Sequence, residues 1–299
     1  MRELTSSPAM LPLFVRAGVA MIPGAQHLPF VGPMVAGGGH DMPDLALRLT
    51  GAQVDGKRVA DYDRACGFAL RDVVPVTYPH ILAFPLQLSL MTDPSFPFPA
   101  IGLVHIANRI IQHRPVGGSE RLQVDVWATP VENHPRGKQF SLRSEVRVGD
   151  ELVWEEDSTN LKRVGGGKDS GSASGSDSRD LPSAEDLPAT ATWKLPGDLG
   201  RRYASVSGDY NPIHIHPLSA RLFGFPSAIA HGMWTEARCL AALEPRLPDA
   251  FTVEVVFKRP ILLPGTAEFC EAQNAGGIDF GVRDPAKGKS HLDGRVTFA

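Results

Sequence analysis

The sequence predicts an α+β protein in which one long helix packs against an antiparallel sheet, and in which this unit occurs twice. An apolar stretch of helix length occurs once in each half, at residues 77–91 and 228–243, and each is followed by segments in which apolar and polar residues alternate. Residues 165–189 separate the halves and are rich in Gly, Ser, Asp and Pro. Because such a segment cannot bury a core, we expect a flexible linker there.

The first half begins with 40 residues rich in Pro and Gly, for which we expect an irregular arm packed on the globule. The long helix over 77–91 contains Pro79 and Pro85. Pro79 can open a helix, whereas Pro85 removes a backbone hydrogen bond inside it, so the helix should be kinked or start late. The remaining elements expected here are a strand at 44–52, a helix at 57–66, and strands at 101–112, 120–132, 139–148 and 151–161.

The second half repeats this order after a short strand and a helical turn. In the helix expected over 228–243, Met233, Ala237, Leu240 and Ala241 share one face, with charged residues on the other. Strands are expected at 252–261, 266–274, 278–283 and 289–298.

Spacing supports a duplication. His80 and His231 stand at the heads of the two long helices, and Gly117 and Gly265 follow them by 37 and 34 residues in the segments HRPVGG and KRPILLPG. The domains expected are an arm at 1–40, a first unit at 41–164, the linker at 165–189 and a second unit at 190–299.

Composition excludes several classes of function. The formal net charge is −3, and no Lys/Arg run is interleaved with aromatics, so nucleic acid is not an expected partner. Three cysteines lie far apart and form no CxxC pair, which favours a reducing, cytoplasmic location. Nowhere does an uncharged apolar run reach the roughly 18 to 20 residues that a membrane helix needs.

Potentially reactive side chains gather between residues 203 and 243, in YASVSGDYNPIHIHPLSARLFGFPSAIAHGMWTEARCLAAL. Asp209 and His214 flank an Asn-Pro turn and can approach a single water molecule, which is what general acid–base chemistry requires. The alternative is purely structural: Asp and Asn build a turn, and Pro starts a helix.

The run from Tyr203 to Ala220 resembles the signature of the MaoC-like, or type 2, enoyl-CoA hydratases. That signature is an aromatic residue, small residues, Gly-Asp-x-Asn-Pro-aliphatic-His, and a small residue shortly after. The following AIAHGM also resembles the start of a helix in that family. The resemblance implies a double hotdog fold in which the first half, lacking the motif, is a degenerate hotdog that shelters the acyl chain.

The resemblance also implies a reaction, the reversible syn hydration of a trans-2-enoyl thioester to an (R)-3-hydroxyacyl thioester. Asp209 and His214 would activate the water, and the backbone N–H of Gly232 would stabilise the developing enolate oxygen. Asn211 is expected to cap or support the turn, and His231 either to orient it or to touch substrate. The substrate would be carried on CoA or acyl carrier protein, with no cofactor.

Several other residues have a structural and a functional interpretation. Lys258 and Arg259 end a strand and are either solvated or in contact with CoA, and Arg201 and Arg202 are weaker candidates for that contact. His80, His105 and His216 are expected to be packing or surface histidines. A zinc pair of His214 and His216 lacks a third ligand in the sequence, so no metal is expected.

Two rival functions remain open. A hotdog thioesterase would need a carboxylate on the long helix, for which Glu236 is the candidate. A non-catalytic acyl-thioester-binding subunit would not need the Asp209/His214 pair, which this chain has intact. Chain length of the acyl group, its carrier, the direction of the reaction and a possible homodimer are not decided by the sequence.

Overall fold

The computed structural model describes residues 1–20, 41–163 and 180–299. The chain folds as two compact units, and both are assembled from separated segments. Unit 1 consists of Met1–Val54, Tyr78–His105 and Ser119–Gly165, and unit 2 of Asp55–Thr77, Ile106–Gly118 and Gly166–Ala299. These divisions differ from the expected domain boundaries, because residues 55–77 and 106–118 of the first half belong to unit 2.

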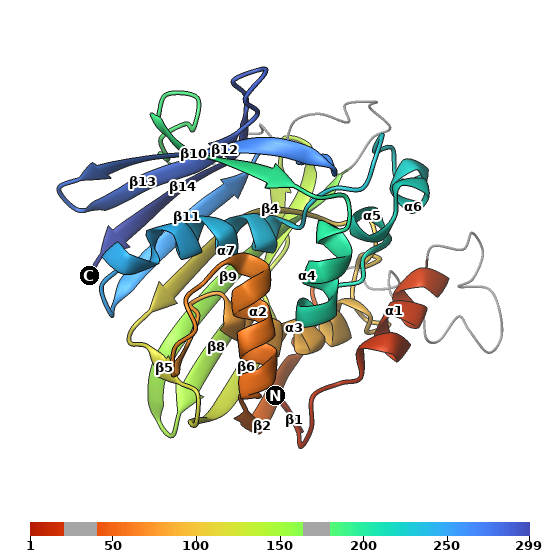
Figure 1. Cartoon of the computed structure of the whole chain (residues 1–299). Helices are drawn as coiled ribbons and strands as arrows, with labels where there is room; N and C mark the ends of the chain where they lie inside the picture. Colours follow the sequence, from red (N-terminus) through yellow and green to blue (C-terminus); the bar gives the residue numbers. More distant parts are fainter. Residues whose placement is uncertain (21–40, 164–179) are drawn as a thin grey trace. The chain divides into compact units, whose positions relative to one another are not determined.

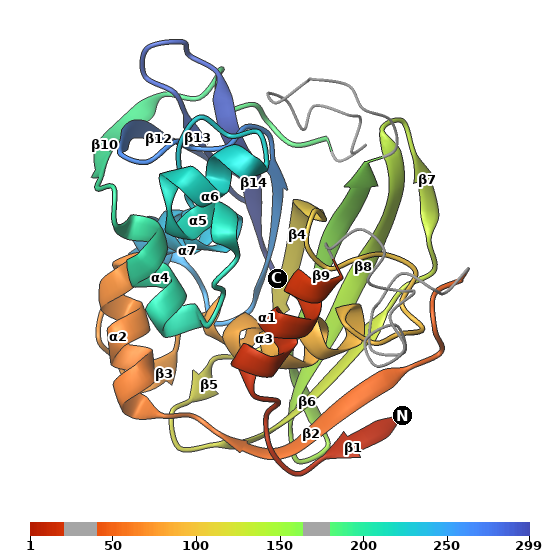
Figure 2. The same ribbon diagram turned by 90° about the vertical axis from the view of Figure 1, so that its right-hand side faces the viewer.

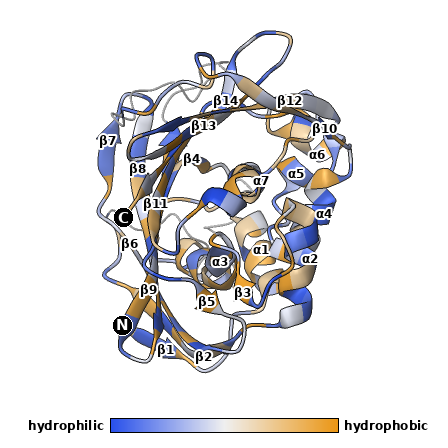
Figure 3. Ribbon diagram, turned by 60° about the vertical axis from the view of Figure 1, so that its left-hand side comes forward, coloured by the Kyte–Doolittle hydropathy of each residue, from blue (hydrophilic) through white to orange (hydrophobic). Residues whose placement is uncertain are grey.

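Unit 1 is an antiparallel sheet with one long helix, α3 (Tyr78–Met91), packed against β2, β6 and β8 (Figure 1). The strands follow the order β1-β2-β6-β8-β9, and only the β1–β2 pair is parallel. Along β8, buried and half-buried residues alternate from Phe140 to Val146. Hydrophilic and hydrophobic residues accordingly both occur along this strand (Figure 3). The strands are β1 (Arg2–Leu4), β2 (Ala46–Gln53), β6 (Arg121–Ala128), β7 (Glu132–His134, paired with β8), β8 (Gly137–Val148) and β9 (Glu151–Arg163).

Helix α3 is buried on nearly all sides. Pro79 lies in its first turn, where no backbone donor is needed, and the helix begins at Tyr78 rather than late. Pro85 lies inside the helix, as the sequence indicates. Its ring removes one backbone donor, which the packing of the surrounding apolar residues compensates.

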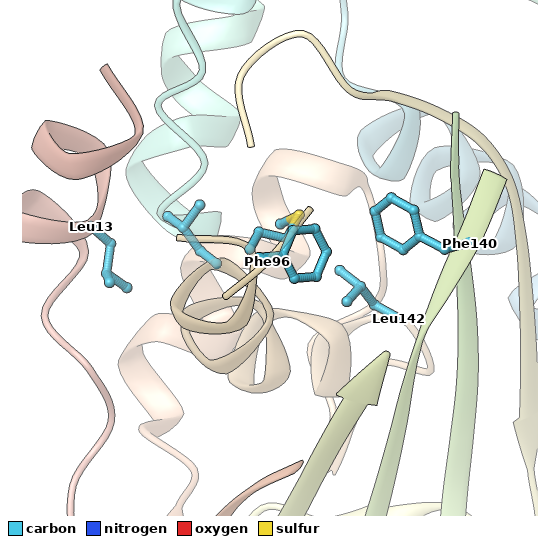
Figure 4. Close-up of a cluster of buried hydrophobic side chains, with 6 residues drawn as sticks. Leu13, Phe96, Phe140 and Leu142 are labelled. Atoms are coloured by element: carbon cyan, nitrogen blue, oxygen red, sulfur yellow. The ribbon is translucent and has the colours of Figure 1, made fainter. Parts of the chain in front are cut away.

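The N-terminal arm is not wholly irregular, so that expectation was wrong for its first 20 residues. β1 pairs with β2, and α1 (Met10–Val19) buries Leu13 and Ala17. Leu13 joins Phe96, Phe140 and Leu142 in a buried cluster that ties α1 to α3 and β8 (Figure 4). The sequence did not reveal this helix because Pro12, which lies inside it, suggested an irregular segment. Residues 21–40 lie outside the described residues.

Unit 2 repeats the plan with a sheet of order β4-β11-β14-β13-β12-β10 and the long helix α7 (Gly232–Leu243) (Figure 1). α7 packs against β13 and against α2 (Gly56–Cys66). The strands are β4 (Val104–Gln112), β10 (Ala189–Leu195), β11 (Phe251–Phe257), β12 (Gly265–Asn274), β13 (Gly277–Arg283) and β14 (Ser290–Phe298), with a small separate pair β3 (Val73–Val74) and β5 (Val116–Gly117).

Helix α7 begins four residues later than the sequence predicts. Residues 228–230 are extended instead, because their backbone pairs with the segment after β11: Ala230 N donates to Ile261 O at 2.9 Å, and Leu263 N to Ala228 O at 2.8 Å. The expected charged outer face of the helix is also wrong, since the side chain of Glu236 is fully buried. α7 is a core helix rather than an amphipathic one.

The described end of the expected linker packs on unit 2. Ala184 is fully buried, and its backbone N–H donates to Asp293 Oδ1 at 2.8 Å. The guanidinium of Arg283 donates to the backbone carbonyls of Ala184, Glu185 and Leu187. Composition alone predicts that this segment is mobile. Because Arg283 donates to its carbonyls, residues 181–188 instead pack as part of unit 2. Residues 164–179 lie outside the described part.

All three cysteines are buried free thiols, as their spacing predicts. Burial raises the pKa of the thiols of Cys66, Cys239 and Cys270. Within the described residues, no helix is long and apolar enough to cross a membrane.

Candidate active site

The Gly-Asp-x-Asn-Pro turn is held by its own polar groups between α4 (Leu199–Ser207) and α5 (Pro212–Ile215). Gly208 ends α4 with a φ of 82°, a conformation that favours glycine. Asp209 N donates to Ser207 Oγ, and Asp209 Oδ1 accepts from Asn211 N, both at 3.1 Å. Asn211 then caps α5 by accepting from Ile213 N at 3.4 Å, which agrees with the structural role predicted for it.

His214 is fixed by two backbone contacts. Its Nδ1 lies 2.8 Å from Ile229 O, and since a carbonyl only accepts, Nδ1 carries the proton and Nε2 is left as the basic nitrogen. Gly200 of α4 packs directly against the backbone of His214: a Cβ at this position would lie 1.9 Å from His214 O. Only glycine permits this approach of α4 to α5.

His231, the residue preceding α7, joins the pair. Its Nε2 lies 3.0 Å from Asp209 O and 3.7 Å from Asp209 Oδ2, so it donates to the turn. Its ring stacks on that of His214 with centroids 3.7 Å apart, and the centroid of the Tyr203 ring lies 4.9 Å from that of His231. Of the two roles considered for His231, these contacts favour orienting the turn.

Burial lowers the pKa of both histidines. For His214, desolvation outweighs the opposing effects of Asp209 and of the bond to Ile229 O, so its pKa lies below the ordinary 6.5. For His231 the shift is larger, because desolvation is reinforced by the neighbouring His214. Both rings are therefore neutral at neutral pH, and His214 Nε2 is available as a base.

Gly232 is the first residue of α7, where helix geometry leaves the backbone N–H without an acceptor in the helix. The ring of Phe257 lies against it, and a Cβ on Gly232 would come within 3.0 Å of that ring. The helix dipole adds positive potential at this end. Gly232 thus offers an N–H donor next to His231 in the chain.

Asp209, His214 and His231 bring one potential ligand atom each within 4.8 Å of one another, a cluster that sequence spacing did not predict. The two rings are stacked with planes 24° apart, however. Imidazole binds a metal through a lone pair in the ring plane at about 2.0–2.1 Å, and near-parallel stacked planes do not direct two such lone pairs to one point. The arrangement suits proton transfer better than metal binding.

Comparisons with known proteins identify the family of this chain. A family model described as MaoC like domain matches residues 185–282. The chain is 38% identical over 256 residues to 3-hydroxyacyl-thioester dehydratase X of Mycobacterium tuberculosis, a match that covers 85% of this chain and 90% of that protein. The chain belongs to the MaoC-like dehydratase family. The motif Tyr203–Ala220 and AIAHGM both fall inside the matched domain.

Solved structures give the same family and fold. The crystal structure of HtdX of M. tuberculosis matches this MaoC-like chain with a TM-score of 0.75 at 36% identity, covering 85% of this chain and all of that one. A second M. tuberculosis protein, described as having a double hotdog fold, matches with a TM-score of 0.50 at 13% identity, covering 86% and 94% of the two chains, and shows the fold alone. The fold is therefore a double hotdog, as predicted.

The basic residues considered for CoA in this MaoC-like chain have partners within unit 2. Lys258 Nζ lies 3.6 Å from Asp293 Oδ2, and Arg259 lies 4.0 Å from Glu185 and donates to Ser290 O. Lys258 and Arg259 directly follow Phe257, whose ring lies against Gly232, so their backbone lies near the start of α7 in space. A contact with CoA stays a prediction.

Three further histidines of the described residues make contacts that fit a structural role. His216 Nδ1 accepts from Leu218 N and caps α6 (Pro217–Leu222). His105 Nε2 lies 3.0 Å from Ser158 Oγ. His80 is buried as expected, but it has a carboxylate partner that the sequence does not reveal, with Nδ1 2.7 Å from Glu156 Oε1.

Sequence reasoning missed two supporting residues of the site, Gly200 and Ser207. Glycine inside a helical segment was the available signal for Gly200, because such a residue weakens a helix unless close packing requires it. No spacing rule pointed to Ser207, whose hydroxyl supports Asp209 across the end of α4.

Proposed function

We propose that this enzyme interconverts trans-2-enoyl thioesters and (R)-3-hydroxyacyl thioesters, by hydration or the reverse dehydration. The observation that carries the proposal is the convergence of Asp209 and His214, both supported by His231, in the arrangement described above. Membership of a family whose relatives are named 3-hydroxyacyl-thioester dehydratases supports it.

In the hydration direction, a water lies between the Asp209 carboxylate and His214 Nε2. As the water oxygen bonds to C3, one water proton passes to this pair of groups, and the electrons of the double bond move through C2 toward the thioester oxygen. The pair then delivers that proton to C2 on the same face, and the electrons return from the thioester oxygen to form the C2–H bond. Since His214 Nδ1 already donates to Ile229 O, the ring can accept a proton only at Nε2.

The negative charge that develops on the thioester oxygen needs a fixed donor. We propose the Gly232 N–H for this role, because it lies at the positive end of α7 and costs no reorganisation when charge develops. No step in this scheme transfers electrons to or from the protein, so the scheme uses no redox cofactor. The thioester carrier, CoA or a carrier protein, is the only additional group it needs.

Two observations argue against the rival functions. Glu236, the candidate carboxylate of a thioesterase, is fully buried in α7, whereas the side chain of Asp209 is 27% exposed and can meet a substrate. A binding subunit would have no need of a base whose tautomer is fixed. Neither rival is favoured by any contact of the described residues.

The test is a hydration assay on crotonyl-CoA and a longer enoyl-CoA, followed by loss of the enoyl absorbance. Asp209→Asn and His214→Ala should each lower kcat by at least about a thousandfold, since two groups that act on one water do not replace each other. Release of free thiol by the wild type would instead indicate a thioesterase. Near-full turnover by either variant would refute the assignment.

A further inference from the structure

The surface formed by α4, α5 and α6 exposes large apolar side chains beside the proposed catalytic pair. Leu222 is 85% exposed, the highest value for a large hydrophobic residue in the described ranges, and Leu218 is 64% exposed. They are four residues apart on α6 and so share one face of that helix. Tyr210, between Asp209 and Asn211, is 50% exposed.

Two arginines on the same helices form no ion pair with a carboxylate of the described residues. Arg201 donates to Ile215 O, and Arg221 to Pro226 O, and both acceptors are backbone carbonyls. In contrast, Arg202 forms an ion pair with Asp198 at 2.7 Å. Residues 198–231 contain three arginines and two carboxylates, those of Asp198 and Asp209, so this region has a formal charge of +1 (three minus two) on a chain of net charge −3.

These residues lie close to the site along the chain and in space. Figure 2 shows α4, α5 and α6 following one another in one region of unit 2. Eight residues separate His214 from Leu222, so their Cα atoms are at most about 28 Å apart. A partner seated on this surface could therefore pass an acyl group on a long flexible arm to Asp209 and His214.

We propose that this surface, made of Arg201, Tyr210, Leu218, Arg221 and Leu222, docks an acidic acyl carrier protein that delivers the thioester. We call it the α4–α6 surface. The inference rests on the proposed function and names the carrier that the site accepts. Charge complementarity and exposed leucines carry it: a positive rim steers an acidic partner, and apolar side chains provide area to bury.

A second copy of this chain fits the α4–α6 surface less well. In a two-fold dimer the same patch meets itself, which would set the positive region against a positive region. CoA is a small ligand and would not bury the apolar surface of both exposed leucines. An acidic protein satisfies both the charges and the apolar area.

The experiment compares one enoyl group on two carriers, the holo acyl carrier protein of a bacterial type II fatty acid synthase and CoA. Arg221→Glu and Leu222→Ser should each lower kcat/KM for the carrier-protein thioester about tenfold or more, and leave that for the CoA thioester within about twofold. Turnover of the CoA thioester shows that each variant is folded. Arg121→Glu and Leu70→Ser, exposed residues elsewhere, are matched controls and should leave both substrates unaffected.

Equal loss with both carriers would assign the surface to the shared pantetheine or to CoA itself, and no loss with either would show that nothing docks there. Both results overturn the proposal. Binding of holo carrier protein without an acyl group, measured by calorimetry on Asp209→Asn, separates docking from catalysis. If docking persists while Asp209→Asn turns over normally, the proposed chemistry fails and the docking inference stands.

Discussion

The heads of α3 and α7 contain the same pair of chemical groups, a histidine and a carboxylate, in different settings. In unit 1, His80 pairs with Glu156, and both are buried, with Gln87 donating a further hydrogen bond to the carboxylate. In unit 2, the buried His231 faces Asp209, whose side chain is 27% exposed on a surface turn. A carboxylate buried this way can hold a fold together, and only one open to solvent can meet a water and a substrate.

Removing the carboxylate from each pair should give the largest contrast. Asp209→Asn should abolish turnover, by a factor of about a thousand or more, because the amide cannot take a proton from water. Glu156→Gln should keep most of the activity of the folded protein. The measurement is kcat on crotonyl-CoA for both variants, normalised to the folded fraction by circular dichroism. Equal losses would mean that the two pairs do not differ in role.

Removing the histidine of the unit 1 pair, His80, should destabilise the protein. His80→Ala removes a hydrogen-bond partner that lies 2.7 Å from the buried Glu156 carboxylate, which should cost about 1–3 kcal/mol. Urea unfolding measures this loss. The double variant His80→Leu/Glu156→Met, which replaces both polar groups, should recover most of the stability. Failure of that rescue would show that the loss came from packing rather than from a lost hydrogen bond.

The close approach of α4 to His214 should be sensitive to a single methyl group. Gly200→Ala would place its Cβ 1.9 Å from His214 O, so the helices must separate and His214 must move. We expect about a tenfold to hundredfold loss in kcat, because small displacements of reacting groups are costly, with a loss of about 1–3 kcal/mol in stability. Gly18→Ala, where the Cβ would meet nothing within 4 Å, is the control: it should leave kcat unchanged and, because Gly18 lies in α1, should not lower stability.

The smallest effect concerns pH. The folded-state pKa values of His214 and His231 lie below 6.5, so below that pH the unfolded chain binds more protons and stability falls as pH falls toward the folded-state pKa values. Above pH 6.5 this contribution is complete. His231 should contribute up to about 1.4 kcal/mol per pH unit in that window. Urea unfolding of His231→Phe between pH 7.5 and 5 should give a flatter profile than wild type, and an identical slope would contradict this.

The sequence predicted the plan of the fold because periodicity of apolar residues shows where helices and strands lie. It placed β2, α2 and the long strands well, and it placed Asp209, His214 and Gly232 in one short span. It could not show that α7 starts at Gly232, because backbone pairing of residues 228–230 with the segment after β11 is a tertiary effect. That the first half shelters the acyl chain stays a prediction.

Contacts between distant residues account for the other differences. Glu156 follows His80 by 76 residues, so no local pattern relates them. Residues 181–188 have the composition of a linker, and only the position of Arg283, about a hundred residues later, fixes their carbonyls. The exposure of Leu218 and Leu222 likewise could not be predicted, because it depends on which face of the short helix α6 is left uncovered by the rest of the fold.

The three buried thiols have a practical consequence. Because each has a raised pKa and is shielded by the core, none should react readily with maleimides under native conditions. Leu222→Cys would then add a single accessible thiol on an otherwise unreactive background. A fluorophore attached there would report directly on anything that settles on the outer face of α6.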